Sequence, residues 1–225
     1  MPEIVVVTGA NRGIGLEFAR QLARRGDSVV GTARRPETAD ALRSLGVRVE
    51  RLDVAEPVSV AAFAKALDGA PVDVLIHNAA IGEEGPGFAR LSMEDLERSL
   101  RVNTLGAARV TQALLPNLRR GKRRLVAALS SGLASLERNR EGGWIAYRVS
   151  KAALNMLIRT TAAELRPDGF TCVLIDPGWV RTDMGGPDAP TPPEKSVESM
   201  LATLGGLRPK DSGRFLTARG RDAAW

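Results

Sequence analysis

The sequence predicts an α/β fold in which helices cover both faces of one doubly wound, parallel sheet of about seven strands. Short runs rich in valine and isoleucine alternate along the chain with longer segments whose apolar residues recur at helical spacing. Such alternation favours right-handed strand–helix–strand crossovers. The length of 225 residues suits one core, and no repeat or linker divides the chain, so we expect a single domain over residues 1–225.

The first strand, predicted at 4–8, leads into a glycine turn and then into an amphipathic helix that Gly26 ends. The turn reads Gly9-Ala10-Asn11-Arg12-Gly13-Ile14-Gly15. Glycines let a pyrophosphate approach the backbone, and the N–H groups at a helix N-terminus bind it. The Gly-x-x-x-Gly-x-Gly spacing is not the commoner Gly-x-Gly-x-x-Gly, and an ordinary glycine-rich turn is the alternative. The place of this turn between a strand and a helix favours a Rossmann-like dinucleotide site.

The second strand, predicted at 28–32, ends in Ala33-Arg34-Arg35. An NAD site usually places an acidic residue here, to hold the ribose 2′-hydroxyl. Arginines, together with Arg12, would instead attract a 2′-phosphate, because a guanidinium binds phosphate bidentately. The sequence therefore predicts NADP(H) in preference to NAD(H), with Arg34 as the phosphate contact because it follows the strand sooner. The alternative is that these arginines lie on a loop surface.

The next elements bring further polar residues to strand ends. They are a short helix at 36–44, a strand at 47–52 ending in Asp53-Val54, a helix from Pro57, and a strand at 72–76 ending in His77-Asn78-Ala79-Ala80. Ligands of parallel sheets bind beyond the carboxyl ends of the strands. We therefore expect Asp53 and Asn78 beside the glycine turn. His77, the only histidine, is interpreted as a packing or hydrogen-bonding residue and not as a base.

The second half continues the alternation. It contains a glycine-rich loop at 82–87, a long helix from the N-cap Ser92 to about Leu118, a strand at 125–129 ending in Ser130-Ser131-Gly132, a helix from about Tyr147, a strand at 170–175 ending in Asp176-Pro177-Gly178, a mobile loop at 181–195, a short helix at 196–204 and a last strand at 214–216. Asn103 lies inside the long helix, where a polar residue is neutral to unfavourable.

Tyr147 and Lys151 stand four residues apart at the start of a helical pattern, so both side chains share one helical face. A free tyrosine has a pKa of about 10 and is a poor acid or base at neutral pH. A nearby positive charge favours the phenolate and lowers that pKa, which suits proton transfer to or from an alcohol or carbonyl. A surface tyrosine beside a solvated lysine is the alternative, because this spacing is common by chance.

Composition excludes several classes of function. Hydrophobic residues make up 44% of the chain, yet no apolar run approaches the roughly 20 residues that span a bilayer. The single cysteine, Cys172, allows no internal disulfide, and with no signal-peptide pattern it suits a reducing, cytoplasmic setting. One cysteine and one histidine leave no metal site. The net charge of +6 includes a basic run at 119–124, but that run falls in a turn and only 4% of residues are aromatic, so we expect no nucleic-acid binding.

Taken together, these motifs resemble the short-chain dehydrogenase/reductase family over essentially the whole chain. The matching elements are Thr8-Gly-x-x-x-Gly13-Ile14-Gly15, Asp53-Val54, Asn78-Ala79-Ala80, Asn103, Ser131, Tyr147-x-x-x-Lys151 and Pro177-Gly178. Each is weak alone, but their order is specific. The segments 142–148 and 176–184 and the terminal Trp225 look closer to the branch of C-factor proteins and sniffer-like carbonyl reductases.

The resemblance implies a role for each matching residue. Tyr147 would be the acid/base, Lys151 would hold the nicotinamide ribose and lower the pKa of Tyr147, and Ser131 would polarise the substrate oxygen. Asn103 would hold a water of a proton relay in a kinked helix. The cofactor would be bound by Gly9, Asn11, Arg12, Gly13, Ile14, Gly15, Arg34, Asp53, Val54, Asn78, Ala79, Ala80, Tyr147, Lys151, Pro177, Gly178, Val180 and Thr182.

Two departures from the family pattern bear on these roles. Ala80 stands where the family has glycine, which costs little if the backbone there has a negative φ. Tyr147 follows Ser131 by 16 residues, a few more than usual, so 133–143 must loop out. If the segment 133–143 does not loop out, Ser130 or Ser135 could take the role of Ser131.

We thus expect an NADP(H)-dependent oxidoreductase that acts on a carbonyl/alcohol pair, with a substrate loop at about 181–205. The alternative is a dinucleotide-binding signalling or regulatory protein with little turnover, since fold alone does not establish function. The family commonly pairs its long helices between subunits, which implies a homodimer or homotetramer. The substrate is not readable; Trp144, Trp179 and Met184 could line an apolar pocket or belong to the core.

Overall fold

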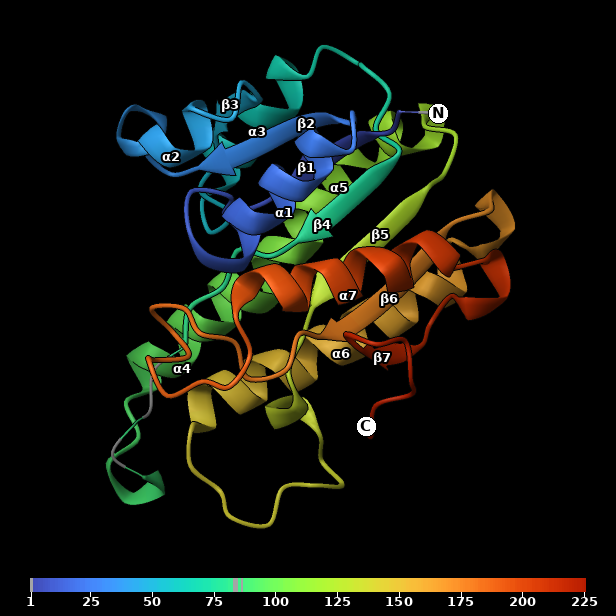
Figure 1. Cartoon of the computed structure of the whole chain (residues 1–225). Coiled ribbons are helices and arrows are strands. Elements are labelled where there is room, and N and C mark those ends of the chain that lie inside the picture. The colour runs from blue at the N-terminus through green and yellow to red at the C-terminus, as the bar shows by residue number, and fades with distance from the viewer. Residues whose placement is uncertain (1, 83–84, 86) are drawn as a thin grey trace.

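A seven-stranded parallel sheet organises the chain, in the spatial order β3-β2-β1-β4-β5-β6-β7 (Figure 1). The computed structural model describes residues 2–82, 85 and 87–225. The strands are β1 (Ile4–Val7), β2 (Ser28–Ala33), β3 (Arg48–Arg51), β4 (Val74–His77), β5 (Leu125–Leu129), β6 (Thr171–Asp176) and β7 (Phe215–Thr217). The helices include α1 (Gly13–Arg24), α2 (Asp40–Arg43), α3 (Pro57–Ala66), α4 (Met93–Leu100), α5 (Gly106–Arg120), α6 (Ile145–Glu164) and α7 (Pro193–Gly206). The predicted fold class is confirmed.

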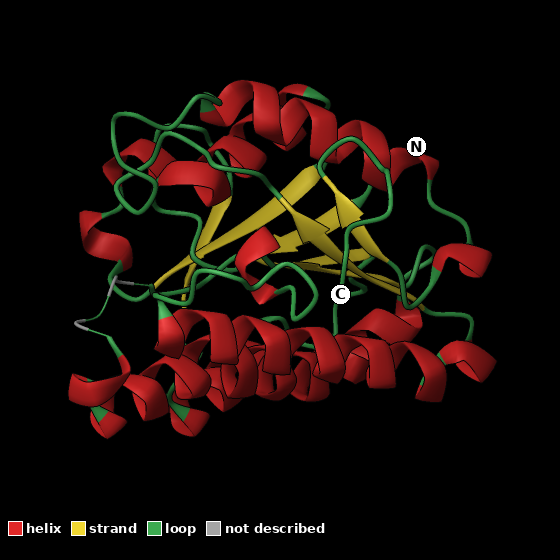
Figure 2. Cartoon of the chain, turned by 90° about the horizontal axis from the view of Figure 1, so that it is seen from below, coloured by secondary structure: helices red, strands yellow, loops and turns green. Residues whose placement is uncertain are grey.

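Helices lie on both faces of the sheet, as Figure 2 shows. Successive residues of a strand point to opposite faces, so the buried valines of β1 divide between two cores. Val6 packs in one core with residues of α3, α5 and α6, whereas Val5 and Val7 pack in the other with residues of α1, α2 and α7. Because both faces are covered, the strands carry near-continuous apolar runs instead of alternating ones.

Two predicted helices differ from the observed ones in ways that have local causes. The segment 36–44 divides into a 3₁₀ turn at Pro36–Thr38 and the short α2. The Thr38 hydroxyl donates to the Arg35 carbonyl, 3.1 Å away, and this bond competes with regular helix formation. At the other end of the chain, α7 begins at Pro193 and not at 196, because proline suits the first helical turn.

The predicted long helix from Ser92 is interrupted in its middle. The Ser92 hydroxyl caps α4 by accepting from the Asp95 N–H at 3.2 Å. A π-helical turn at Arg101–Leu105 then separates α4 from α5. Such turns occur often at functional sites, and this one contains Asn103. Among the described residues, no helix combines the length and the apolar character needed to cross a membrane.

The sequence predicts a mobile loop at 181–195, but hydrogen bonds within this segment after β6 hold its ends together. The Arg181 N–H donates to the Thr191 carbonyl at 2.8 Å, and the Arg181 guanidinium donates to the Ala189 carbonyl at 3.1 Å. Ala189 is fully buried. These contacts fix the ends of the loop against each other and hold it beside the carboxyl edge of the sheet.

The basic run at 119–124 closes the amino edge of the sheet, opposite the glycine turn. Arg119 pairs with the Asp168 carboxylate at 2.8 Å, and Arg123 pairs with that of Glu3 at 2.7 Å. Gly121 lies between them, against the backbone of Val72. These arginines therefore fasten neighbouring turns to one another, so their charges are partly matched within the chain.

Replacing Gly121 with alanine should destabilise the fold. A Cβ there would lie 2.0 Å from the Val72 carbonyl oxygen, so the backbone must shift. We expect a loss of about 1–3 kcal/mol in the free energy of unfolding, measured with urea. Gly205 in α7 is the matched control, because a Cβ there meets nothing within 4 Å. Gly205→Ala should be neutral or stabilising; equal losses in both variants would contradict the close approach at Gly121.

Candidate active site

A cleft of about 280 Å³ opens at the carboxyl edge of the sheet, between the glycine turn and the start of α6. The predicted site residues that line it are Gly9, Asn11, Arg12, Gly13, Ile14, Arg34, Asp53, Val54, Asn78, Ala79, Ala80, Tyr147, Lys151, Pro177 and Thr182. These residues follow six different strands, and the parallel topology brings them together at one edge of the sheet although they are far apart in the sequence. Arg35, which the sequence analysis placed beside Arg34 near a 2′-phosphate, also lines the cleft. Thr38, Leu129 and Asp183 line it as well, and sequence reasoning did not place them there.

The glycine turn has no room for side chains at the positions that face the strand ends. Gly9 and Gly13 have φ of +64° and +55°, in the left-handed region that favours glycine. A Cβ at Gly15 would lie 2.4 Å from the Asn78 amide nitrogen. That nitrogen donates to the carbonyls of Thr8 and Gly9, at 2.9 and 2.8 Å. Asn78 thus locks the turn to the end of β4, which leaves a shaped cradle at the N-terminus of α1.

This cradle has the features that a dinucleotide pyrophosphate needs. Backbone N–H groups at a helix N-terminus attract anions, and absent side chains let a phosphate approach. The Thr8 hydroxyl accepts from the N–H groups of Asn78 and Ala79, both at 3.0 Å, so the two turns move as one unit. Ala80 is not among the described residues with positive φ, so its extra methyl group costs little strain, as expected.

Basic residues line the end of the cleft that lies beside β2. Arg34 and Arg35 are exposed directly after β2, where no acidic residue stands. Arg12 pairs with Asp183 at 2.5 Å, and this bridge connects the glycine turn to the segment after β6. Both side chains are more than two-thirds exposed, and such pairs contribute only up to about 1 kcal/mol. A phosphate can therefore replace Asp183 as the partner of Arg12.

The segment after β6 approaches the glycine turn from the other side. A Cβ at Gly13 would contact the Thr182 methyl group at 3.4 Å, so Thr182 faces the turn. Gly178 has φ of +80°, and Asp176 accepts from its N–H at 3.0 Å. The side chain of Val180 is buried and does not line the cleft, so only its backbone is available for the predicted cofactor contact.

Tyr147 and Lys151 share one face of α6, as their spacing predicts. The Lys151 ammonium is buried and donates to the Leu129 carbonyl at 2.8 Å, and it lies 5.7 Å from the centre of the Tyr147 ring. Burial lowers the pKa of Lys151 to about 8. A carbonyl at the end of β5 therefore holds the cation in place, and this backbone group has no signature in the sequence.

The structure brings Ser131, and neither alternative serine, to the Tyr147 phenol. The Ser131 side chain lies near enough to the Tyr147 phenol to lower the pKa of that phenol, and its hydroxyl oxygen also accepts from the Leu133 N–H at 3.1 Å. The Ser130 hydroxyl instead donates to the Asn155 side chain at 2.5 Å, and that of Ser135 donates to the Trp225 carbonyl at 2.9 Å. This placement is possible because the segment 133–143 loops away from the sheet between β5 and α6 (Figure 1).

The expectation that Lys151 lowers the pKa of Tyr147 is wrong for this structure. Burial raises the pKa of Tyr147 to about 12; the Ser131 side chain opposes this rise and the charge of Asp176 adds to it. Lys151 lies over the ring, but burial of the phenol has the largest effect on the pKa of Tyr147. The phenol is therefore a neutral hydrogen-bond donor across the neutral pH range.

Asn103 holds a loop in place with its side chain. Its amide oxygen accepts from the Ile81 N–H, and its amide nitrogen donates to the Ile81 carbonyl, both at 2.8 Å. The same nitrogen donates to the Ser150 hydroxyl at 2.9 Å. The next residue, Gly82, abuts the Tyr147 ring: a Cβ there would lie 2.5 Å from the ring. The π-helical turn thus positions the phenol through Asn103 and the Ile81–Gly82 backbone, while the water-holding role stays a prediction.

His77 contributes structure to this region. Its ring nitrogen lies 2.7 Å from the Thr111 hydroxyl of α5, and the ring is buried. Burial, with a smaller effect of the Lys151 charge, lowers the pKa of His77 to about 3. The ring is neutral at neutral pH and makes the hydrogen bond that the sequence analysis expected of it.

Ultraviolet titration tests the environment of Tyr147 without any assay of activity. Tyr147 is the only tyrosine, so the phenolate absorbance reports it alone. We expect ionisation near pH 12, above the ordinary 10, because burial disfavours the charged form. Asp176→Asn removes a negative charge and should move the midpoint to lower pH. A wild-type midpoint at or below 10 in the folded protein would refute the buried, neutral phenol.

Comparisons with known proteins agree with this arrangement. Residues 3–192 match the family model for the short chain dehydrogenase. The chain is 48% identical to the C-signal protein of Myxococcus xanthus over 164 residues, which cover 73% of this chain and 99% of that one. Among solved structures, the carbonyl reductase Sniffer of D. melanogaster superposes with a TM-score of 0.93 at 28% identity, covering all of both chains. The NADPH-bound carbonyl reductase from chicken fatty liver superposes with a TM-score of 0.92 at 33% identity, covering 100% of this chain and 99% of that one. The chain therefore belongs to the short-chain dehydrogenase family of oxidoreductases.

Proposed function

We propose that this protein is an NADP(H)-dependent oxidoreductase that interconverts a carbonyl compound and its alcohol, with Tyr147 as the acid/base. One observation carries the proposal. The Tyr147 phenol, whose pKa the Ser131 side chain lowers, shares a helical face with Lys151 in a cleft that also contains the glycine cradle. A proton donor, a hydroxyl and a cation therefore meet where a dinucleotide would end.

Ser131, Tyr147 and Lys151 would each have a separate role in carbonyl reduction. NADP(H) bound in this cleft supplies the hydride. The Ser131 and Tyr147 hydroxyls hold the substrate oxygen by hydrogen bonds and stabilise the negative charge that develops on it. A phenol with a pKa of about 12 is a weak acid, yet an alkoxide is a stronger base and takes its proton. Lys151 places a positive charge beside the resulting phenolate, and its ammonium would bind the nicotinamide ribose.

The preference for NADP(H) over NAD(H) rests on charge at the end of β2. Arg34 and Arg35 line the cleft there together with Thr38 of the following turn. Guanidinium groups bind a 2′-phosphate bidentately, and the chain has no acidic residue at this strand end for a free 2′-hydroxyl. The similar carbonyl reductase from chicken fatty liver has NADPH bound, which supports the same assignment.

A second candidate function is dinucleotide-dependent signalling with little turnover. The 48% identity to the C-signal protein favours it. Tyr147 and Lys151 together in one cleft, with Ser131 near the phenol, argue against it, because a sensor needs no proton donor. Stoichiometric NADPH binding without oxidation by any of a panel of aldehydes and ketones would favour this candidate.

The proposed oligomeric state and cellular location rest on exposed apolar residues and on the single cysteine. Leu105, Val149 and Met156 leave apolar surface on the long helices, which supports a homodimer or homotetramer. Cys172 is a free, buried thiol, in keeping with a cytoplasmic location.

Tyr147→Phe tests the acid/base role. The phenylalanine ring keeps the packing against Gly82 but cannot donate a proton. We expect kcat for carbonyl reduction to fall at least about 10²–10⁴-fold, with NADPH affinity nearly unchanged in a fluorescence titration. Turnover near the wild-type rate would reject the role of Tyr147.

Arg34→Ala tests the cofactor preference. Loss of a charge-assisted contact should weaken NADPH binding by about 10–100-fold and leave NADH binding unchanged. Arg43→Ala is the control, because Arg43 is an exposed arginine of α2 that pairs with Asp40 and does not line the cleft. An equal loss of affinity for NADPH and NADH would show that Arg34 does not contact the 2′-phosphate.

A further inference from the structure

Arg148 follows Tyr147 near the start of α6, and its partly buried side chain turns back toward the segment that precedes the helix. The Nε of its guanidinium donates to the Gly143 carbonyl at 3.0 Å, and Nη1 donates to the Leu133 carbonyl at 3.3 Å. Leu133 and Gly143 are the two ends of the segment that loops away from the sheet between β5 and α6. One side chain therefore joins the two ends of this loop.

The amino end of α6 is an unfavourable place for this cation. The N-terminus of a helix carries a partial positive charge, so acidic side chains are preferred there. The first turn of α6 contains no acidic residue, and no side chain of the described chain caps it. The Arg148 guanidinium nevertheless lies at this end, because it donates to Gly143, which precedes the helix. Its two carbonyl partners, and not the stability of the helix, account for an arginine at this position.

The backbone that leads into α6 is strained. Gly142, Gly143 and Trp144 have φ of +69°, +70° and +50°, all in the left-handed region. A bulky residue such as tryptophan is an outlier there, and such strain persists only where the surrounding structure fixes it. The hydrogen bond from Arg148 reaches the middle residue of this run. It therefore helps to fix the turn that sets where α6 begins.

The other partner of Arg148 holds Ser131. The Ser131 hydroxyl oxygen accepts from the Leu133 N–H at 3.1 Å and so caps the short turn Gly132–Ala134, which we call the serine turn. Because the oxygen of Ser131 is the acceptor in this bond, its hydrogen stays available for a substrate oxygen. An accepted hydrogen bond also polarises the hydroxyl and makes it a better donor. Arg148 fixes Leu133 through its carbonyl and thereby the group that orients this hydroxyl.

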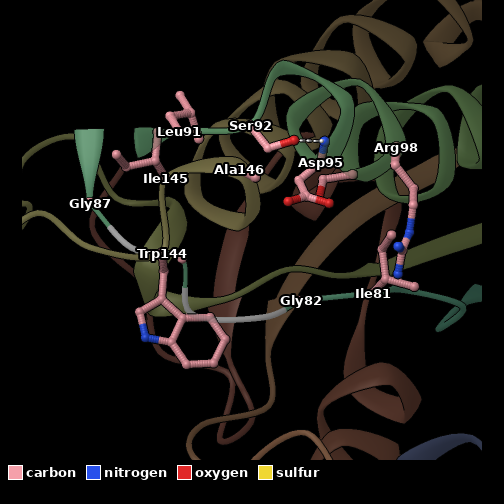
Figure 3. A pocket seen from close by; sticks show the side chains of 12 residues that line it. Ile81, Gly82, Gly87, Leu91, Ser92, Asp95, Arg98, Trp144, Ile145 and Ala146 are labelled. Atoms are coloured by element: carbon pink, nitrogen blue, oxygen red, sulfur yellow. Dashed lines mark hydrogen bonds between the residues drawn. The ribbon is translucent and has the colours of Figure 1, made fainter. Parts of the chain in front are cut away.

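Arg148 lines neither of the cavities that border the start of α6. The cofactor cleft includes Tyr147 and Lys151 but, among the residues that the structure describes, not Arg148. A pocket of about 140 Å³ beside α4 is lined by Trp144, Ile145 and Ala146, as Figure 3 shows, and its described lining also omits Arg148. Any effect of Arg148 on the site therefore passes through the backbone of the loop whose ends it joins.

We propose that Arg148 is a positioning residue for carbonyl reduction, which holds the Ser131 hydroxyl at a fixed place beside the Tyr147 phenol by joining the two ends of the loop. The inference rests on the proposed function. A guanidinium suits this task, because its donors have a fixed planar geometry and it stays protonated at all working pH values.

The outer part of the loop has an anchor of its own. The Trp225 carbonyl accepts from the Ser135 hydroxyl at 2.9 Å and from the Glu137 N–H at 3.0 Å. The Trp225 indole is held in turn by Arg159 of α6, whose guanidinium carbon lies 4.4 Å from the ring centre. Loss of Arg148 should therefore loosen the serine turn without unfolding the segment.

A double-mutant cycle separates positioning from a purely structural role. Arg148→Ala should lower kcat for carbonyl reduction by about tenfold, with KM and NADPH affinity changed by less than about threefold, because Arg148 lines neither cavity. Ser131→Ala should then cost about tenfold less in kcat in the Arg148→Ala background than in the wild type, since the serine is no longer held in place. Losses that simply multiply would overturn the proposal.

Arg124→Ala is the matched control. Arg124 also joins two backbone carbonyls, those of Asp168 and Arg119 at 2.6 and 3.1 Å, but it lies at the amino edge of the sheet. This variant should keep the wild-type kcat, and its effect should multiply with that of Ser131→Ala. If Arg148→Ala fails to fold, Arg148→Lys takes its place in the cycle. Lysine keeps the charge without the planar fork, so a smaller coupling of about threefold is expected, and no coupling would overturn the proposal.

Hydrogen exchange measured by NMR tests the contact without any assay of activity. The Leu133 N–H should exchange at least about tenfold faster in Arg148→Ala than in the wild type, and at the wild-type rate in Arg124→Ala. If the wild-type protein reduces no carbonyl compound, the proposed function fails, and the exchange rate still decides whether Arg148 holds the serine turn. If carbonyl reduction is observed but the cycle shows no coupling or the exchange rate of Leu133 is unchanged, the inference fails alone.

Discussion

The hydrogen bond from the buried Lys151 ammonium to the Leu129 carbonyl is the contact on which the site depends. Burying a cation is costly, and the cost appears as the depressed pKa of about 8. The bond fixes α6 to the carboxyl end of β5 and thereby sets the height of Tyr147 above the sheet. Since Ser131 follows the same strand, one strand end aligns the cation, the phenol and the serine hydroxyl.

The phenol is held from two further directions. Asn103, in the π-helical turn, binds the backbone of Ile81 and so brings Gly82 against one side of the ring. The strained Trp144 meets the ring edge to face. Several kinds of constraint therefore fix a single side chain, and preorganised groups of this sort need no rearrangement when charge develops on a substrate. The π-helical turn at 101–105 and the left-handed backbone of Trp144 are each unfavourable locally, and both hold the Tyr147 ring in place.

Much of the fold and of the cleft could be predicted because it depends on local pattern. Buried strands read as apolar runs, parallel topology brings their carboxyl ends to one edge, and Asn78, Arg34 and Tyr147 follow from their place in that order. The rest depends on tertiary contacts. A backbone carbonyl such as that of Leu129 has no sequence signature, and the raised pKa of Tyr147 arises from burial and from Asp176, which is distant in sequence. The pairing of Arg12 with Asp183, and the left-handed backbone of Trp144, likewise exist only in the folded chain.

A crystal structure of the NADPH complex tests the central claim most directly. The account predicts the pyrophosphate at the cradle of Gly9 and Gly13, the 2′-phosphate at Arg34, and the nicotinamide ring beside the Tyr147 hydroxyl with the Lys151 ammonium at its ribose. A nicotinamide ring turned away from Tyr147, or a dinucleotide bound outside this cleft, would contradict it.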